Sequence, residues 1–317
     1  MKLTQLIAQY VAFRKSLGQD FESNERRLRT FSRFVGERAD IRCLKAGQVA
    51  SFLAGHGPIT CYWHVKYAAL RGLFSYAVTR GYLSASPLPA TVPKQPARFV
   101  PHIYSMDELR RLLDGTASYQ KHKTRILMEP HTFRAILLLL YGAALRVSEA
   151  LSLNLADVDL EERVIVIRDT KFYKTRLVPV GSDLNDAMTN YIKQRKGDGH
   201  SPSNTAPFFV TRLGARIPIR LIQRAFRRLR AHSGVRRKGG TRCQPRLHDL
   251  RHTAAVHRLT AWYREGKDVQ RLLPLLSTYL GHVDIASTQL YLTMTPDLLH
   301  EASKRFAKYV FGEVNHD

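Results

Sequence analysis

The sequence is poor in cysteine and contains no long apolar run. Its 317 residues include only three cysteines, Cys43, Cys61 and Cys243, and their spacing suggests no pairs. An odd number of scattered cysteines argues against a disulfide framework and is typical of thiols that stay reduced in a cytosol. The sequence shows neither an apolar stretch of membrane-spanning length nor the apolar core of a signal peptide. We therefore expect a soluble, cytoplasmic protein with no membrane partner.

Acidic residues are also scarce. Asp and Glu total 26 against 50 Lys and Arg, which gives a formal net charge of +24 and a pI near 10.3. The excess occurs throughout the chain, because residues 1–100 hold 15 basic and 5 acidic residues and the remainder holds 35 and 21. Solubility alone requires far less charge, so two basic parts indicate a clamp around a polyanion such as nucleic acid.

Two kinds of ligand site are missing from the sequence pattern. The carboxylates form no cluster of the type that holds Mg²⁺, and no glycine-rich loop of the type that binds ATP phosphates occurs. His248 and His252 have the spacing of a helical zinc site, but the Glu of such a hydrolase motif is absent. We therefore expect no cofactor and no metal ion.

Residues 1–90 have the pattern of a helical domain. Apolar residues such as Leu28 and Phe31 recur at helical spacing, which predicts helices that pack around a common core. Basic residues lie among the periodic apolar residues of the third predicted helix of this domain, near Tyr67 and Phe74. The candidates for contact with DNA are Lys66, Arg71 and Arg80.

A proline-rich segment separates this part from the rest of the chain. Residues 84–101 contain five prolines and almost no periodic pattern, which predicts an extended linker. We place the linker at residues 91–102 and a second domain at residues 103–317. In that domain the apolar stretch of residues 136–145 predicts a buried helix that runs up to Arg146.

A small β-hairpin is predicted within the second domain. The apolar segment VIVI at residues 164–167 and the segment RLVPV at residues 176–180 flank a few turn-forming residues. Basic residues lie at and beside this turn, namely Lys171, Lys174 and Arg176. Lys174 and Arg176 are further candidates for contact with DNA.

The segments that flank the hairpin in the sequence contain residues suited to phosphate chemistry. In YGAALRVSEALSL, Arg146 adjoins an apolar helix, where a guanidinium needs an anionic partner. In RLHDLRHTAA, His248 and Arg251 are three residues apart, so a helix would direct both into the same space. In STYLGHVDIASTQLYLTMTP, His282 follows a Leu-Gly turn and Tyr291 lies nine residues beyond it.

Together these segments resemble the tyrosine recombinase (phage integrase) family, which carries two arginines, a hairpin lysine, two histidines and a nucleophilic tyrosine. The matching positions are Arg146, Lys171, His248, Arg251, His282 and Tyr291. Lys171 is assigned by counting back from RLVP, and Lys174 is the alternative. The family usually has a Thr-Gly pair before its first arginine, where this chain has Ala143 and Ala144. The resemblance implies a mainly α two-domain DNA clamp, in which a helical core-binding domain precedes a catalytic domain with a small β-hairpin or sheet.

The resemblance also implies a reaction. Tyr291 would attack the scissile phosphate and form a 3′-phosphotyrosine, while Arg146 and Arg251 bind its non-bridging oxygens. His248 would accept the tyrosine proton, His282 would donate a hydrogen bond to the phosphate, and Lys171 would protonate the leaving 5′ oxygen. Because the covalent intermediate conserves the bond energy, religation needs no ATP.

Family likeness further implies a homotetramer, or an assembly with related recombinases, on double-stranded DNA that carries specific recombination sites. The stretch AWYREGKDVQRLLPLLSTYLGH is similar to recombinases of mobile elements, which favours integration, excision or transposition of DNA at the nucleoid. Two alternatives stay open at this stage. One is a DNA-relaxing enzyme of the type IB topoisomerase class, and the other is a DNA-binding regulator without catalysis.

Overall fold

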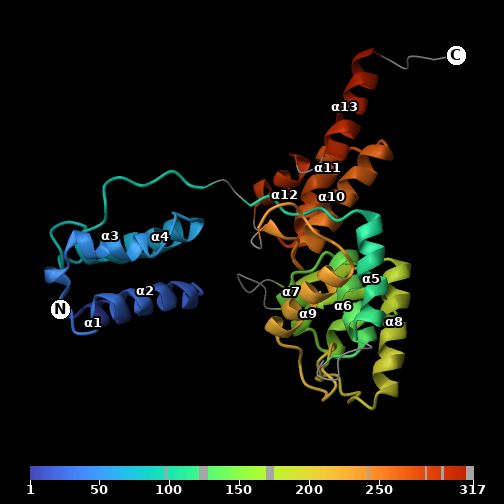
Figure 1. Ribbon diagram of the computed structural model, residues 1–317, viewed down its shortest axis with the longest axis horizontal. Helices are drawn as coiled ribbons and strands as arrows, with labels where there is room; N and C mark the ends of the chain where they lie inside the picture. Colours follow the sequence, from blue (N-terminus) through green and yellow to red (C-terminus); the bar gives the residue numbers. More distant parts are fainter. Residues whose placement is uncertain are drawn as a thin grey trace. The chain divides into compact units, whose positions relative to one another are not determined.

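The computed structural model describes residues 1–96, 99–120, 128–168, 175–240, 243–282, 284–293 and 296–311. The chain forms two compact units, Met1–Arg98 and Phe99–Asp317. The boundary between them falls inside the proline-rich segment. Helices dominate both units and the larger one contains a small sheet, which confirms the predicted fold class (Figure 1). In the described ranges, no helix is both long and apolar enough to span a membrane.

The smaller unit is built from helices that enclose an apolar core. Its elements are α1 (Leu3–Ser16), α2 (Glu22–Val35), the short 3-10 helix η1 (Ile41–Cys43), α3 (Ala46–Ala54) and α4 (Cys61–Thr79). The longest of them, α4, begins where the Thr60 side chain accepts a hydrogen bond from the backbone N–H of Tyr62. Leu28, Phe31 and Phe74 are fully buried in this core, which explains the apolar periodicity of the sequence.

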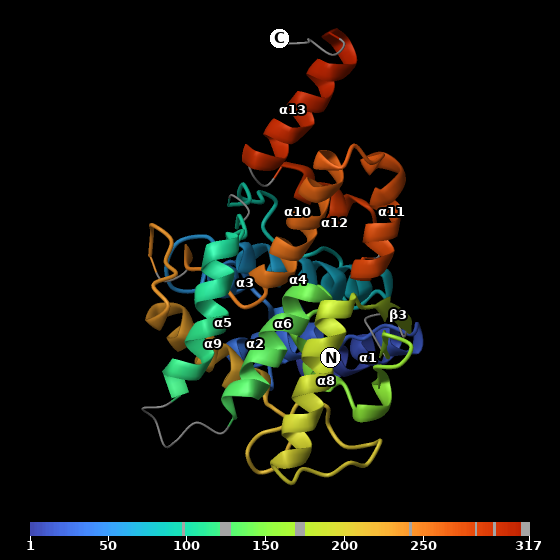
Figure 2. The ribbon, with the colours of Figure 1, turned by 90° about the vertical axis from the view of Figure 1, so that its right-hand side faces the viewer.

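The larger unit is also mainly helical. Its helices are α5 (Met106–Gln120), α6 (Pro130–Gly142), α7 (Val147–Ser152), α8 (Ser182–Gly197), α9 (Ile219–His232), α10 (Asp249–Arg264), α11 (Val269–Leu280), α12 (Ala286–Gln289) and α13 (Pro296–Phe311), with the 3-10 helices η2 (Leu155–Asp157) and η4 (Leu290–Thr293). Figure 2 shows α13 extending away from α10, α11 and α12. Leu298 at the start of α13 is fully buried, whereas Phe306 is 65% exposed.

A three-stranded antiparallel sheet lies between η2 and α8 in the sequence. Its strands are β1 (Val158–Asp159), β2 (Val164–Ile167) and β3 (Arg176–Pro179), in the order β1-β2-β3. The predicted hairpin corresponds to β2 and β3, in which Ile165 pairs with Val178. The sequence pattern did not indicate β1, because two residues are too few to show a strand periodicity.

The buried helix predicted for residues 136–145 ends earlier than expected. Helix α6 stops at Gly142, and Ala144 adopts a φ of 50°. This left-handed conformation is unfavourable for a residue with a Cβ and breaks the helix before Arg146. Arg146 then becomes the N-cap residue of α7. The break matters for the site, because it turns the backbone of Ala144 toward α10.

Candidate active site

Three arginines from different elements converge on one carboxylate, that of Glu149 in α7. Glu149 accepts hydrogen bonds from Arg146 Nη1 at 2.7 Å and from Arg176 Nη1 and Nη2 at 3.0 and 2.9 Å. Arg251 Nη1 lies 3.9 Å from its Oε2. Burial by itself raises the pKa of Glu149, but the hydrogen bonds from Arg176 and Arg146 outweigh it and hold this pKa at about 2. Glu149 is therefore ionised and holds the cationic side chains together.

The two predicted catalytic arginines lie in different environments. Arg251, in the first turn of α10, is 2% exposed and donates to the carbonyl oxygens of Ala144 at 2.7 Å and Leu280 at 2.5 Å. The side chain of Arg146 is 33% exposed and donates to the carbonyl of Gly281 at 2.8 Å. Burial lowers the pKa of Arg251 to about 10, which leaves it charged at neutral pH. Both guanidiniums are thus fixed by backbone carbonyls.

Tyr291 lies in η4 and is 2% exposed. Its hydroxyl oxygen is 3.1 Å from Nδ1 of His252, and its ring is stacked on that of His282 with centroids 6.0 Å apart. Burial raises the pKa of Tyr291, while the positive charges of Arg251 and Arg146 act in the opposite direction. The structure therefore brings the predicted nucleophile to both predicted arginines.

The predicted histidines occupy different places around Tyr291. His282 follows the left-handed Gly281 at the end of α11, and its Nδ1 lies 2.7 Å from Oγ1 of the buried Thr288. Burial, followed by the charges of Arg251 and Arg146, lowers the pKa of His282 to about 4. His248 is the N-cap residue of α10, and its ring centroid lies 4.9 Å from that of His252.

Two of the predicted DNA contacts, Lys66 and Arg176, have largely buried side chains, which the sequence interpretation did not indicate. Lys66 is only 8% exposed, and its ammonium group donates to the carbonyl of Phe52 in the core of the smaller unit. Arg176 has a side chain only 12% exposed, because it binds Glu149 and the carbonyl of Tyr279. Neither side chain is exposed in the way expected of a contact with the backbone of double-stranded DNA. A sequence signal existed for Lys66, which lies three residues after the buried Trp63 and four before the buried Leu70.

The other predicted basic residues divide into two groups. Arg71 in α4 and Arg80 at its C-cap are exposed, and the Arg80 guanidinium lies over the Tyr76 ring, 5.5 Å from the ring centroid. Lys171 and Lys174 lie outside the described residues. Their segment connects Arg168, after β2, to Thr175, before β3.

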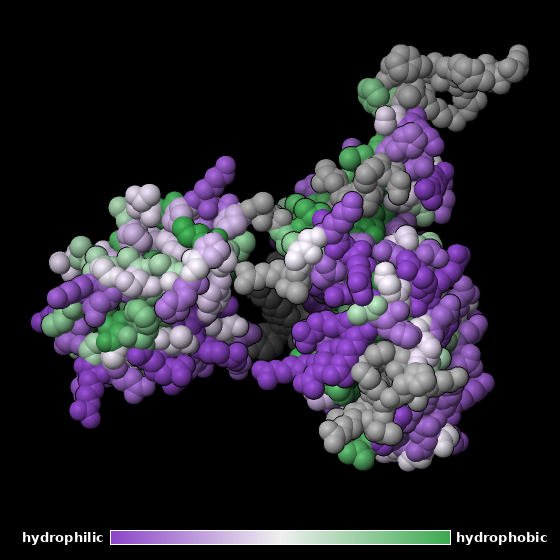
Figure 3. Space-filling model, viewed as in Figure 1, coloured by the Kyte–Doolittle hydropathy of each residue, from purple (hydrophilic) through white to green (hydrophobic). Residues whose placement is uncertain are grey.

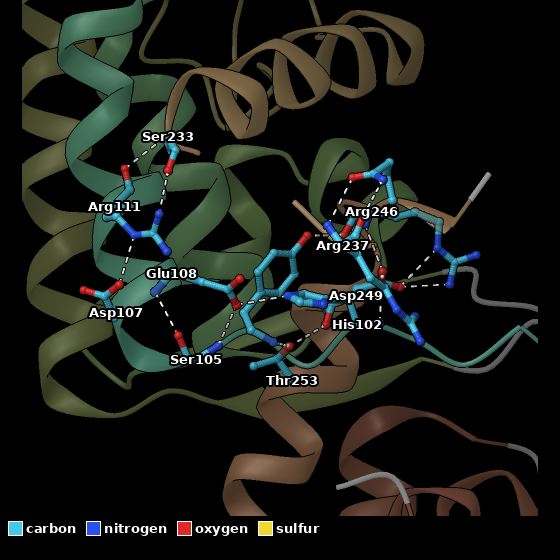
Figure 4. A network of polar contacts seen from close by, with 12 residues as sticks. His102, Ser105, Asp107, Glu108, Arg111, Ser233, Arg237, Arg246, Asp249 and Thr253 are labelled. Atoms are coloured by element: carbon cyan, nitrogen blue, oxygen red, sulfur yellow. Dashed lines mark hydrogen bonds and ion pairs between the residues drawn. The ribbon is translucent and has the colours of Figure 1, made fainter. Parts of the chain in front are cut away.

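A second buried carboxylate, that of Asp249, secures the start of α10 (Figure 4). It is fully buried and accepts hydrogen bonds from the backbone N–H of Arg246 at 2.9 Å and from its guanidinium at 3.1 and 2.8 Å. The backbone N–H of Tyr104 donates to Oγ1 of Thr253 at 3.0 Å, and its hydroxyl donates to the carbonyl of Arg246 at 2.9 Å. The segment that enters the larger unit is thereby attached to the helix that carries Arg251.

A basic surface that the sequence interpretation missed lies on α9. Residues 199–248 contain 12 Lys and Arg and no Asp or Glu. Helix α9 buries Ile222, Phe226 and Leu229 and leaves a row of exposed basic side chains, which are Arg220, Arg224, Arg227 and Arg228. In the view shared by Figures 1 and 3, the area over α9 is mostly hydrophilic. The signal was available as arginines at helical spacing on the face opposite the apolar stripe.

Known proteins match the chain over most of its length. Residues 105–297, which include all the predicted catalytic positions, match the phage integrase family. A Sinorhizobium fredii protein named as an integrase/recombinase, y4rB, is 33% identical over 305 residues, which cover 96% of each chain. The tyrosine recombinase XerC of Thermodesulfovibrio yellowstonii is 30% identical over 229 residues, which cover 71% of this chain and 69% of that one.

Solved structures show the same fold. The Tn1549 transposon integrase in complex with transposon right end DNA gives a TM-score of 0.67 at 17% identity, and the match covers 98% of this chain and 100% of that one. A lambda integrase dimer bound to a COC′ core site gives a TM-score of 0.66 at 16% identity, with 90% and 97% covered.

Proposed function

The chain belongs to the phage integrase family of tyrosine recombinases, which cleave and religate DNA at specific sites, and we propose that Tyr291 is its nucleophile. The observation that supports this assignment is the place of the Tyr291 hydroxyl, buried beside Arg251 and His252 in the site where Glu149 gathers Arg146 and Arg251. A buried tyrosine with only a packing role would be expected among apolar side chains, without charged groups beside its hydroxyl.

Arg146 and Arg251 bind the non-bridging oxygens of the scissile phosphate. Negative charge on those oxygens grows as phosphorus becomes five-coordinate, so paired guanidinium donors stabilise the transition state more than the ground state. Glu149 holds both arginines before DNA arrives, which avoids reorganising them during the reaction. In this proposal His282, which lies beside the Tyr291 ring, and His248, at the start of α10, donate hydrogen bonds to the same phosphate.

In the cleavage step, the Tyr291 oxygen forms a bond to phosphorus and the bond from phosphorus to the 5′ oxygen breaks. The leaving 5′ oxygen then takes a proton, which we assign to Lys171, with Lys174 as the alternative. Religation is the reverse step, in which a 5′ hydroxyl attacks the 3′-phosphotyrosine and releases Tyr291.

In this proposal, basic residues of both units bind the phosphates of the DNA. Arg71 and Arg80 supply exposed charge in residues 1–90, which we propose as the core-binding domain, and the arginine row of α9 supplies it in the catalytic domain. We propose that four copies assemble on the DNA of a mobile element at the nucleoid. The exposed Phe306 of α13 is a candidate for contact between copies.

The test is the formation of a covalent adduct. The purified protein would be incubated in EDTA with a nicked duplex from the ends of its native element, and the products separated on a denaturing gel. We expect an adduct with the wild-type chain and none with Tyr291→Phe, although both bind the duplex equally. Tight binding without an adduct would support the non-catalytic alternative instead, and an adduct with Tyr291→Phe would place the nucleophile elsewhere.

A further inference from the structure

The proposed reaction assigns no role to His252, which is the last residue of the His-Asp-Leu-Arg-His motif. Its Nδ1 lies 3.1 Å from the Tyr291 hydroxyl oxygen, and the centroids of the two rings are 5.6 Å apart. The side chain is partly buried in α10, one residue after Arg251. His248, which the sequence predicts as the acceptor of the tyrosine proton, contacts His252.

We propose that His252, rather than His248, is the general base that takes the proton of Tyr291. This inference rests on the proposed function, because it assigns the proton that the nucleophile must lose. In the tautomer with hydrogen on Nε2, the Tyr291 hydroxyl donates to the lone pair of Nδ1. Arg251 also lies beside Tyr291, but a guanidinium has no acceptor and can only stabilise the phenolate.

The surroundings suit this role. Burial, followed by the nearby His248, lowers the pKa of His252 to about 4, so its ring is neutral and can accept a proton at neutral pH. A bound phosphodiester adds negative charge beside the ring, which favours the imidazolium that forms. Arg251 and Arg146 favour the phenolate through their positive charges.

The proton balance of the step is complete. The phenol proton moves from the Tyr291 oxygen to Nδ1 of His252 as the oxygen attacks phosphorus. The leaving 5′ oxygen receives a different proton, from the hairpin lysine. In religation the attacking 5′ hydroxyl returns a proton to that lysine and the His252 imidazolium returns its proton to the departing phenolate, so the enzyme ends in its initial state.

The experiment compares rates of adduct formation under single-turnover conditions. In His252→Asn, the amide oxygen replaces Nδ1 as a hydrogen-bond acceptor but is not a base, so a role limited to holding the hydroxyl would survive. Loss of a general base lowers rates by about 10²–10⁴-fold, and we expect a loss of about a hundredfold or more. His252→Gln, tested in parallel, covers the case in which the Asn variant does not fold.

The same helix offers a matched control. Nδ1 of His257 lies 2.9 Å from the hydroxyl of Tyr141, a second pair of the same chemistry away from the nucleophile. His257→Asn therefore reproduces the loss of a His–Tyr contact in α10 without touching Tyr291. We expect its adduct to form at the wild-type rate.

Two chemical changes separate a base from other roles. A duplex with sulfur in place of the 5′ bridging oxygen has a leaving group that needs no proton, so it should rescue a Lys171→Ala variant but not His252→Asn. A difluorotyrosine at position 291, whose phenol is more acidic, should restore most of the rate to His252→Asn. A wild-type rate in His252→Asn, or rescue of this variant by the sulfur substrate, would overturn the assignment. Failure of the wild-type chain to form any adduct would instead refute the proposed function.

Discussion

The guanidinium of Arg176 binds both carboxylate oxygens of Glu149, at 3.0 and 2.9 Å. This bidentate pair joins β3 to α7 and leaves Arg176 little surface for DNA. It also compensates the charge of Glu149, to which Arg146 donates as well. Glu149 is thus the shared anionic partner of these arginines, and under the proposed function it would act on the reaction by positioning them.

Glu149→Gln should impair both stability and catalysis. The amide keeps the shape of the side chain but leaves the guanidiniums of Arg146 and Arg176 without an anionic partner. Breaking a buried ion pair in this way costs about 3–5 kcal/mol in the free energy of unfolding. Urea denaturation would measure this loss, and the adduct assay would measure catalysis. An unchanged midpoint would show that the cluster contributes nothing to folding.

The stability contributed by Glu149 should depend on pH. Although burial by itself raises its pKa, hydrogen bonds from Arg176 and Arg146 lower this pKa from the usual value of 4.5 to about 2 in the folded chain. Because the folded-state pKa is the lower one, the contribution is fully present above about pH 4.5 and is lost as the pH falls toward 2. A shift of this size corresponds to about 3 kcal/mol. The difference in free energy of unfolding between wild type and Glu149→Gln should therefore shrink between pH 5 and pH 3, and a constant difference would contradict the assignment.

Asp249→Ala should destabilise the larger unit. The substitution removes a fully buried carboxylate and leaves the partly buried backbone N–H groups of Arg246 and His102 without their acceptor. Unpaired buried groups of this kind cost about 1–3 kcal/mol each. Asp107→Ala removes an exposed carboxylate that pairs with Arg111, and such pairs contribute about 0.2–1 kcal/mol. Urea denaturation of the two variants should differ clearly, and equal losses would refute a special role for Asp249.

The Ala144→Gly variant should be more stable than the Ala143→Gly variant. Both methyl groups are buried, so either substitution loses about 0.8 kcal/mol of apolar burial. At Ala144, with a φ of 50°, relief of the left-handed strain returns about 1–2 kcal/mol. Ala143 has a φ of −99° and gains nothing. Thermal denaturation should rank the Ala144 variant above the Ala143 variant, and the reverse order would contradict the strained conformation.

The arginine row of α9 should contribute to DNA binding mainly through charge. Replacing Arg224 and Arg228 with Ala removes two exposed cations without touching the buried face of the helix. The slope of log affinity against log salt should become less steep by about 0.9 for each lost phosphate contact. Lys193→Ala on α8, which also removes an exposed cation, is the control and should leave the slope unchanged. Equal slopes for all variants would place the DNA on another surface.

Local patterns predicted the helical character of residues 1–90 and the hairpin, because these features depend on the spacing of apolar residues in short windows. Such patterns did not predict that α6 ends at Gly142. Nothing in the run of apolar residues 136–145 indicates that Ala144 turns left-handed. That conformation is supported by the hydrogen bond between its carbonyl and Arg251, a residue 107 positions later.

The sequence alone determined the family motif and so predicted the chemical groups of the proposed site, because the order and spacing of two arginines, two histidines and a tyrosine are local properties of three segments. Only the tertiary structure decided which groups meet. The approach of η4 to α10 places Tyr291 beside His252, and the approach of β3 to α7 commits Arg176 to Glu149. These contacts depend on the packing of elements far apart in the chain. A short window of sequence contains only one partner of each contact, so it cannot predict them.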